Sequence, residues 1–223
     1  MKLFLQILLL SLLLFPTLAV AQYDTKAEET LKQMSDIHKK MNSYKADFMC
    51  VVHSEAENID ESFSGIITVK GNKYKLQMAD WQEIYNNGST VWTYIKSKKS
   101  TKTSKDEVTI TNYEPETEEI NIAQIFHIYK KGFKYLYIED EKIDNEIFEI
   151  IDLTPLDKEK EYFKIKLSIN KKTKELKKFQ IFEKSGKKTI ITINKLAGNL
   201  KLEDSFFNFD KTKYKNVYEV DLR

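Results

Sequence analysis

The side chains most able to do chemistry are three histidines and one cysteine: His38, His53, His127 and Cys50. The histidines are far apart in sequence, and none has the H-x-x-x-H spacing that brings two rings to one metal ion. His38 lies beside lysines and His127 beside an apolar stretch, so we expect both rings at solvated positions. A lone cysteine is more often a small buried apolar residue than a reactive thiol, and we interpret Cys50 in that way.

Sequence signatures of common catalytic sites are absent. No G-x-S-x-G, P-loop or G-x-G-x-x-G occurs, and the six glycines stand mostly at turns. Acidic runs such as Glu139–Asp140–Glu141 exist, but glycoside hydrolysis needs two carboxylates that oppose each other across a cleft. The sequence therefore predicts a binding protein that is not an enzyme, with no catalytic residue, no cofactor and no metal.

The charge pattern argues against a nucleic-acid partner. The chain has 36 basic and 34 acidic residues, which are well mixed and leave a net charge of +2. Arg223 is the only arginine, whereas base and phosphate readers usually need the guanidinium fork. We interpret the many lysines as a solvated surface.

The N-terminal residues predict export. Lys2 precedes the apolar run Leu3–Phe15, and the small residues Ala19 and Ala21 fit an A-x-A cleavage site. The run is shorter than the roughly 20 residues of a membrane-spanning helix, which disfavours the alternative of an uncleaved anchor. We therefore expect cleavage after Ala21, leaving residues 22–223 as one domain.

Two helical patterns stand among the residues of this domain. The first is a stripe with spacings of three and four, made of Ala27, Leu31, Met34, Ile37 and Met41. Thr25 and Glu28 predict a capping box at its start, and Asn42–Ser43 marks its end. The second comprises Ile122, Ile125, Phe126 and Tyr129 before Gly132.

Strand patterns fill the rest of the chain. The clearest is Phe163–Ile169, in which apolar residues alternate with Lys164, Lys166 and Ser168. Similar runs are separated by turns such as Gly71–Asn72 and Asn86–Asn87–Gly88. About ten to eleven strands joined by such turns predict a mostly antiparallel barrel or sandwich.

Three stretches, taken together, resemble a known family. Asn87–Tyr94 reads NGSTVWTY, and Phe63–Tyr74 reads FSGIITVKGNKY, which is similar to the glycine- and lysine-containing hairpin of that family. The C-terminus, from Phe206–Asp210 to Val220–Arg223, resembles an F-x-F … VxDLR ending. With a helix before the first strand, this order resembles the periplasmic outer-membrane lipoprotein carrier family (LolA-type) across essentially the whole mature chain.

The resemblance implies a half-open antiparallel β-barrel of about eleven strands, with the N-terminal helix and a lid helix on its concave side. It implies a hydrophobic cavity for the acyl chains of lipoproteins. The cargo would come from an inner-membrane lipoprotein-releasing ABC transporter and pass to an outer-membrane acceptor that remains unknown. Family members often carry an arginine that bonds the lid, but the equivalent turn here is Lys70–Gly71–Asn72. Lys70 or Lys73 is the available substitute.

The residues expected to line the cavity are the apolar members of the predicted inward faces and of the lid. They are Phe48, Val52, Leu76, Trp92, Tyr94, Ile125, Phe126, Leu167 and Ile169. Each could equally be ordinary core. Two other functions stay open: a half-barrel that binds or senses another lipid or a glycolipid, and a non-catalytic structural domain of the cell envelope.

Export predicts a processed chain. We expect the protein isolated from the cell envelope to start at Gln22, because Ala19 and Ala21 suit the peptidase that removes residues 1–21. Intact mass spectrometry measures this directly. A mature protein that still carries Met1 would contradict the prediction of a released carrier.

Overall fold

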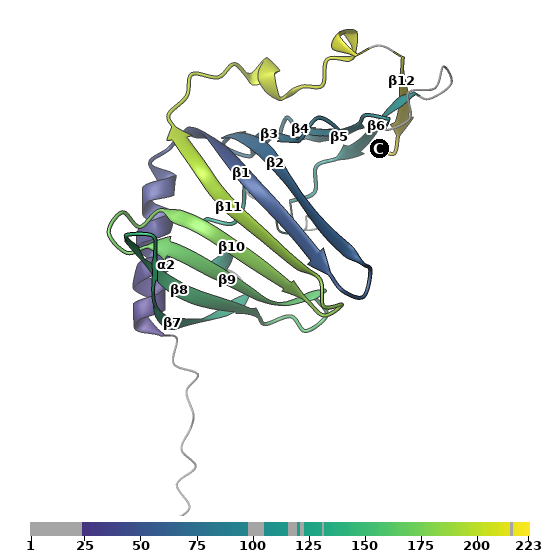
Figure 1. Cartoon of the computed structure of the whole chain (residues 1–223). Helices are drawn as coiled ribbons and strands as arrows, with labels where there is room; N and C mark the ends of the chain where they lie inside the picture. Colours follow the sequence, from purple (N-terminus) through teal and green to yellow (C-terminus); the bar gives the residue numbers. More distant parts are fainter. Residues whose placement is uncertain (1–23, 98–104, 116–119, 121–122, 131, 215) are drawn as a thin grey trace, which may run out of the picture.

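The computed structural model describes residues 24–97, 105–115, 120, 123–130, 132–214 and 216–223, so the expected signal peptide lies outside it. These residues contain one α-helix, α2 (Thr25–Lys39), and twelve strands (Figure 1). The strands are β1 (Ser43–Ser54), β2 (Ile59–Lys70), β3 (Lys73–Met78), β4 (Gln82–Asn86), β5 (Thr90–Ile95), β6 (Asp106–Asn112), β7 (Phe133–Ile143), β8 (Glu146–Pro155), β9 (Tyr162–Asn170), β10 (Leu176–Glu183), β11 (Lys188–Gly198) and β12 (Val217–Asp221). The 3-10 helices are η1 (Ile128–Lys130), η2 (Asp204–Phe207) and η3 (Lys211–Lys213).

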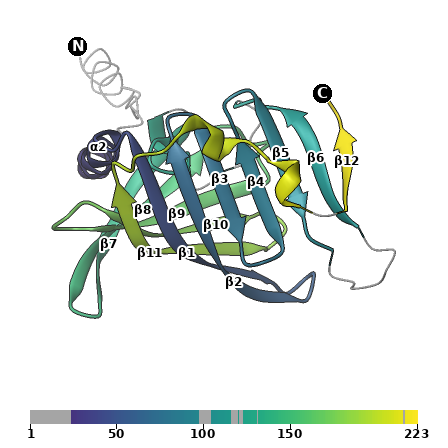
Figure 2. The same ribbon diagram turned by 90° about the horizontal axis from the view of Figure 1, so that it is seen from above.

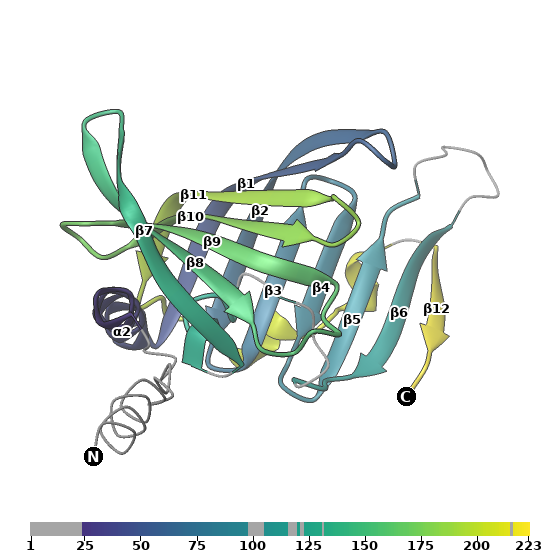
Figure 3. The same cartoon turned by 90° about the horizontal axis from the view of Figure 1, so that it is seen from below.

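All twelve strands form one open sheet, in the order β12-β6-β5-β4-β3-β2-β1-β11-β10-β9-β8-β7 (Figure 3). Neighbours are antiparallel, except that β12 runs parallel to β6. The predicted mostly antiparallel, half-open fold is confirmed, but with twelve strands rather than about eleven. The additional strand is β12, a short C-terminal strand of five residues.

Helix α2 begins one residue earlier than the sequence suggested. Asp24, not Thr25, is the N-cap, and its carboxylate accepts hydrogen bonds from the amides of Lys26 and Ala27 at 2.9 and 3.0 Å. The helix ends at Lys39, and its buried face includes His38. The prediction that His38 is solvated is therefore wrong, since only 7% of it is exposed. In the described part of the chain, no helix is long and apolar enough to cross a membrane.

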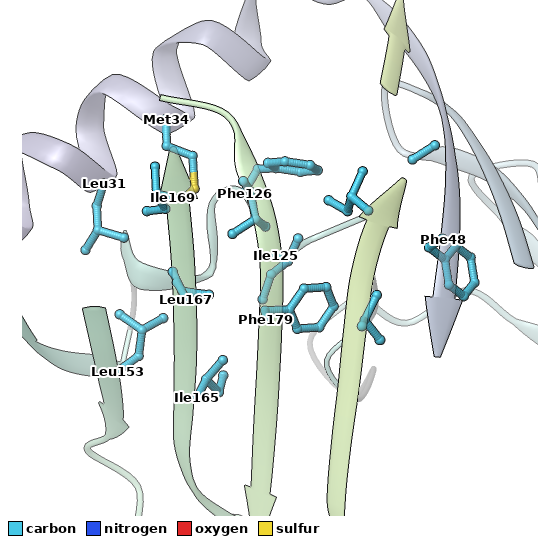
Figure 4. Close-up of a cluster of buried hydrophobic side chains, with 14 of the residues drawn as sticks. Leu31, Met34, Phe48, Ile125, Phe126, Leu153, Ile165, Leu167, Ile169 and Phe179 are labelled. Carbon is cyan, nitrogen blue, oxygen red and sulfur yellow. The ribbon is translucent and has the colours of Figure 1, made fainter. Parts of the chain in front are cut away.

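The inner face of the sheet carries the main apolar cluster. Leu31 and Met34 of α2 pack there against Leu167, Ile169 and their neighbours (Figure 4). Residues from β1–β3 and from β8–β11 belong to the same cluster, so the two halves of the sheet curve around one interior. The helix closes one end of this interior.

The opposite, outer face is crossed by the segment between β11 and β12. This segment, residues 199–214, contains η2 and η3 and runs across the strands from β3 toward β6 (Figure 2). Within this segment, Phe207 is fully buried and the Phe209 ring stacks on Tyr94 of the sheet. We call residues 199–214 the strap.

Strands β1 and β2 approach closely where the Phe48 ring lies over Gly65. Gly65 pairs with Phe48, and a Cβ atom on Gly65 would lie 2.2 Å from the Phe48 ring. On the other side of β1, the ladder with β11 has a bulge opposite Asp47 and Phe48, where β11 carries the extra residue Asn194, and such a bulge increases local twist. Glycine is thus needed at this position for space rather than for an unusual backbone conformation.

We expect Gly65→Ala to lower the free energy of unfolding by about 1–3 kcal/mol, because the added methyl group overpacks the Phe48 ring. Chemical denaturation measures the change as a lower midpoint. Ser64→Ala, an exposed position one residue earlier on the same strand, is the matched control and should shift stability by less than about 0.5 kcal/mol. Equal midpoints for the two variants would contradict this packing role.

Candidate functional site

Seven of the nine predicted lining residues come together on the inner face. Phe48, Leu167 and Ile169 are buried in the sheet, while Val52 and Leu76 are half-buried at the margin of the same cluster. Ile125 and Phe126 pack onto this surface from the segment before β7 (Figure 4). The structure thus assembles these seven residues, but whether they contact lipid stays a prediction.

Trp92 and Tyr94 lie on the other face. Across β3, β4 and β5, Leu76 pairs with Ile84 and Ile84 with Thr93, so Thr93 shares the inner face. Trp92, one residue earlier, pairs with Tyr85 on the outer face, and the Tyr94 ring contacts Phe209 and Tyr214 of the strap. The predicted inward position of Trp92 and Tyr94 is wrong, because alternation separates two faces without saying which one is inside.

The predicted second helix over residues 122–129 is not a helix where it is described. Residues 123–127 form successive turns that end in η1, and Ile122 lies outside the described residues. The segment nevertheless covers the inner face, with Ile125 and Phe126 at 0 and 1% exposure. We call residues 123–130 the lid.

Aromatic and polar contacts hold the lid to α2 and β1. The rings of His38 and Phe126 stack with centroids 3.7 Å apart, and the Tyr44 ring meets His38 edge-on at 4.4 Å. The Tyr44 hydroxyl donates to the Ala123 carbonyl at 3.4 Å, and the oxygen of Ser35 lies 2.8 Å from Nδ1 of His127. These contacts join the lid to α2 and β1.

Among the described residues, neither Lys70 nor Lys73 contacts the lid. Lys70 and Lys73 both bind Asp204 of the strap, at 2.9 and 2.7 Å, and Lys70 also donates to the Leu202 carbonyl. Hydrogen bonds from Lys73 and Lys70, and then the charges of these lysines, lower the pKa of Asp204 to about 2. The idea that one of them latches the lid is therefore not supported, and both instead fasten the strap.

Residue patterns alone do not predict the strap or the part of the outer face that it covers. Glu83 accepts hydrogen bonds from the hydroxyls of Tyr85 and Tyr214, and the Tyr85 ring also contacts Phe209. Burial alone would raise the pKa of Glu83, but these two hydrogen bonds and nearby Lys75 lower it. The sequence signal for this packing is the aromatic run near Phe206.

Beside the lid lies a cleft of about 810 Å³. Its apolar lining includes Ile120, Ile128, Phe133 and Tyr162, from the lid region and from β7 and β9. Polar groups stand among them: Gln124, His127, Lys130, Asp157 and Lys160. The cleft therefore continues the apolar inner face toward solvent along one edge of the lid.

A second approach to the inner face lies at the far end of β1 and β2. Val52, Phe63 and Ile181 are half-buried there and pack against the core cluster. The Phe63 ring meets Trp81 edge-on at 6.2 Å. No group of three or more His, Cys, Asp or Glu side chains in the described ranges could hold a metal ion.

Comparisons with known proteins find a matching family model and solved structures of similar fold. A family model described as outer membrane lipoprotein carrier protein LolA matches residues 39–210. No curated protein matches the chain. An uncharacterized conserved protein from Thermus thermophilus has a TM-score of 0.56 at 9% identity, covering 88% of this chain and 100% of that chain.

Two further solved structures are similar at lower scores. LprF from Mycobacterium bovis has a TM-score of 0.48 at 13% identity, covering 81% of this chain and 97% of its own. A LolA superfamily protein from Nitrosomonas europaea has a TM-score of 0.43 at 13% identity, covering 82% and 97%. At such identities the structural likeness concerns the fold alone.

The inner face predicts an inert cysteine. Cys50 is 5% exposed, and burial raises its pKa to about 11. At pH 8 only about one thiol in a thousand is then the reactive thiolate, so labelling by a thiol reagent should be slow until the chain is unfolded. Ser64→Cys in a Cys50→Ser background, an exposed thiol on the neighbouring strand, should label rapidly. Equal labelling rates for the two folded proteins would contradict this placement.

Proposed function

The chain belongs to the LolA family of outer membrane lipoprotein carrier proteins, and from this membership we propose that it carries the acyl chains of lipoproteins across the periplasm. The observation that supports the proposal is the inner-face cluster, which is continuous from the buried core to half-buried residues at its margin. Acyl chains need such a surface because each methylene exposed to water costs about 0.8 kcal/mol. A 16-carbon chain would therefore need apolar cover for about 12 kcal/mol.

In this proposal the lid occupies the place of the cargo. Ile125 and Phe126 fill the inner face, so an acyl chain must displace them or enter beside them through the cleft. When the lid leaves, the surface that it covered becomes available to the acyl chain. The lid and the acyl chain therefore compete for the same apolar surface of the inner face. Cargo then opens the lid only to the extent that it binds the open form better.

The surface explains how one carrier could accept different cargo. The inner-face cluster offers apolar contacts from several strands and few polar groups that would select one headgroup. Such a lining retains a chain by area and releases it without breaking many directional bonds. The proposal assigns the chain no catalytic step, and it requires export by the predicted signal peptide.

The proposed route has two partners outside the chain. An inner-membrane lipoprotein-releasing ABC transporter would load the carrier, and an acceptor at the outer membrane would unload it. Mass spectrometry of molecules that copurify with the native protein separates this route from the alternative of another lipid or glycolipid as cargo. Diacylated or triacylated peptides would support the carrier, whereas free lipid alone would favour the alternative.

Two adjacent residues of β1 offer a matched test of the site. Val52 lies on the inner face and Val51 on the outer face, and both are half-buried. We expect Val52→Glu to weaken binding of a fluorescent acyl probe about tenfold or more, because a carboxylate would have to be desolvated against the chain. Val51→Glu should leave probe affinity unchanged. If both variants fold and bind like the unmodified protein, the inner face is not the acyl site.

A further inference from the structure

His38 has an unusual environment for a titratable side chain. Its ring is 7% exposed and lies flat against Phe126, with an interplanar angle of 12°. Tyr44 closes one edge of the ring, and His127 of the lid stands with its centroid 5.4 Å away. The side chain of α2 that stacks on Phe126 of the lid is therefore one that can acquire a charge.

The neutral ring is the form that fits this environment. Nε2 of His38 is buried without a hydrogen-bond partner among the described residues. A neutral imidazole can leave that nitrogen without a proton, whereas an imidazolium must donate from both nitrogens and carries a charge that burial penalises. Protonation of His38 therefore requires water or a partner that the closed lid does not provide.

The surrounding ionisable groups do not supply a counter-charge. They come from three packed elements: Tyr44 of β1, His127, Tyr129 and Lys130 of the lid, and Asp36 and Lys39 of α2. Burial raises the pKa of Tyr44, so that its hydroxyl stays neutral. Asp36 is exposed and pairs with Lys39 at 3.8 Å, while Lys39 and Lys130 add positive charge beside His127. Among the residues that the structure describes, a second positive charge at His38 would meet no balancing carboxylate.

We propose that the lid is an acid-opened latch, in which protonation of His38 breaks its stack on Phe126 and releases residues 123–130 from α2. This inference concerns how access to the proposed acyl-binding face is regulated. It rests on the proposed function only for the purpose that opening of the lid would serve. Its physical basis is the differential fit of neutral and charged His38 to the closed lid. His127, bonded to Ser35 at the same contact, reinforces the effect when it too is charged.

The direction of the pH dependence follows from the two forms. In the closed form, burial and then the charge of His127 lower the pKa of His38 from 6.5 to about 4. Once the lid opens, the ring is hydrated and its pKa returns toward 6.5. Closure is therefore fully stable above pH 6.5 and weakens as the pH falls, by up to about tenfold per unit, until about pH 4. The pKa of His127 is lowered as well, by burial and by Lys130 and Lys39, so its contribution has the same sign.

Hydrogen exchange of the lipid-free mature chain tests the latch. We expect opening of the lid, measured as exchange of residues 123–130 and corrected for the intrinsic pH dependence, to increase about thirtyfold between pH 7.5 and 5. His38→Phe retains a flat ring against Phe126 but cannot be protonated, so it should lose most of this increase. His38→Gln, which is polar and does not titrate, should also lose most of this increase. His53→Phe, an exposed histidine of β1, should behave like the unmodified protein.

Two results would overturn the latch. One is an unchanged pH dependence in either folded His38 variant. The other is a lid already open at pH 7.5 in His38→Phe, because the ring stack should keep it closed. Peptides around Leu167 report whether the whole domain unfolds instead. The exchange experiment contains no lipid, so its result does not depend on the carrier function. If the lid opens in acid but the protein binds no acyl probe, the latch is supported and only the proposed carrier function is rejected.

Discussion

The structure depends on one physical constraint: an open, curved sheet must cover its apolar inner face and also the apolar part of its outer face. A fully buried leucine, isoleucine or phenylalanine contributes about 1.5–3 kcal/mol relative to an exposed one, so neither face can be left bare. Helix α2 and the lid cover the inner face, and the strap covers the outer face near β3–β6. A closed barrel would need only an interior, whereas this sheet needs a cover on each side.

The two covers are fastened by different chemistry. The strap adds charged and hydroxyl contacts to its own buried aromatic rings: Asp204 binds two lysines, and Glu83 accepts hydrogen bonds from two tyrosines. The lid is fixed mainly by apolar burial and by the ring stack on His38. Ion pairs and hydrogen bonds require particular partners, but an apolar surface accepts any apolar replacement. The face covered by the lid is thus the face on which a ligand could replace the cover.

Much of the fold could be predicted from residue patterns, and the misses have identifiable causes. Alternation in Phe163–Ile169 placed Leu167 and Ile169 on one face, and the structure buries both. The same alternation could not orient Trp92, because the strap that covers the outer face comes from residues more than a hundred positions later. His38 was misplaced for a similar reason: its buried position depends on Phe126, which is distant in sequence. Local patterns predict elements, while the covering of a face is a long-range property.

The lid's departure from helical form has a consequence for its energetics. Its apolar spacing resembles a helix, yet the described residues make turns, with backbone bonds such as those from His127 to Gln124 and from Lys130 to His127. A segment with few backbone hydrogen bonds can leave its place without first breaking a cooperative helix. Its cost of opening is then mostly the apolar surface of Ile125 and Phe126, which an acyl chain would cover again, together with the contacts around His38. An incoming acyl chain would cover the apolar surface again, but it would not replace the contacts around His38. The His38 contact is therefore where pH can control an exchange of lid for cargo that the apolar surface alone leaves nearly balanced.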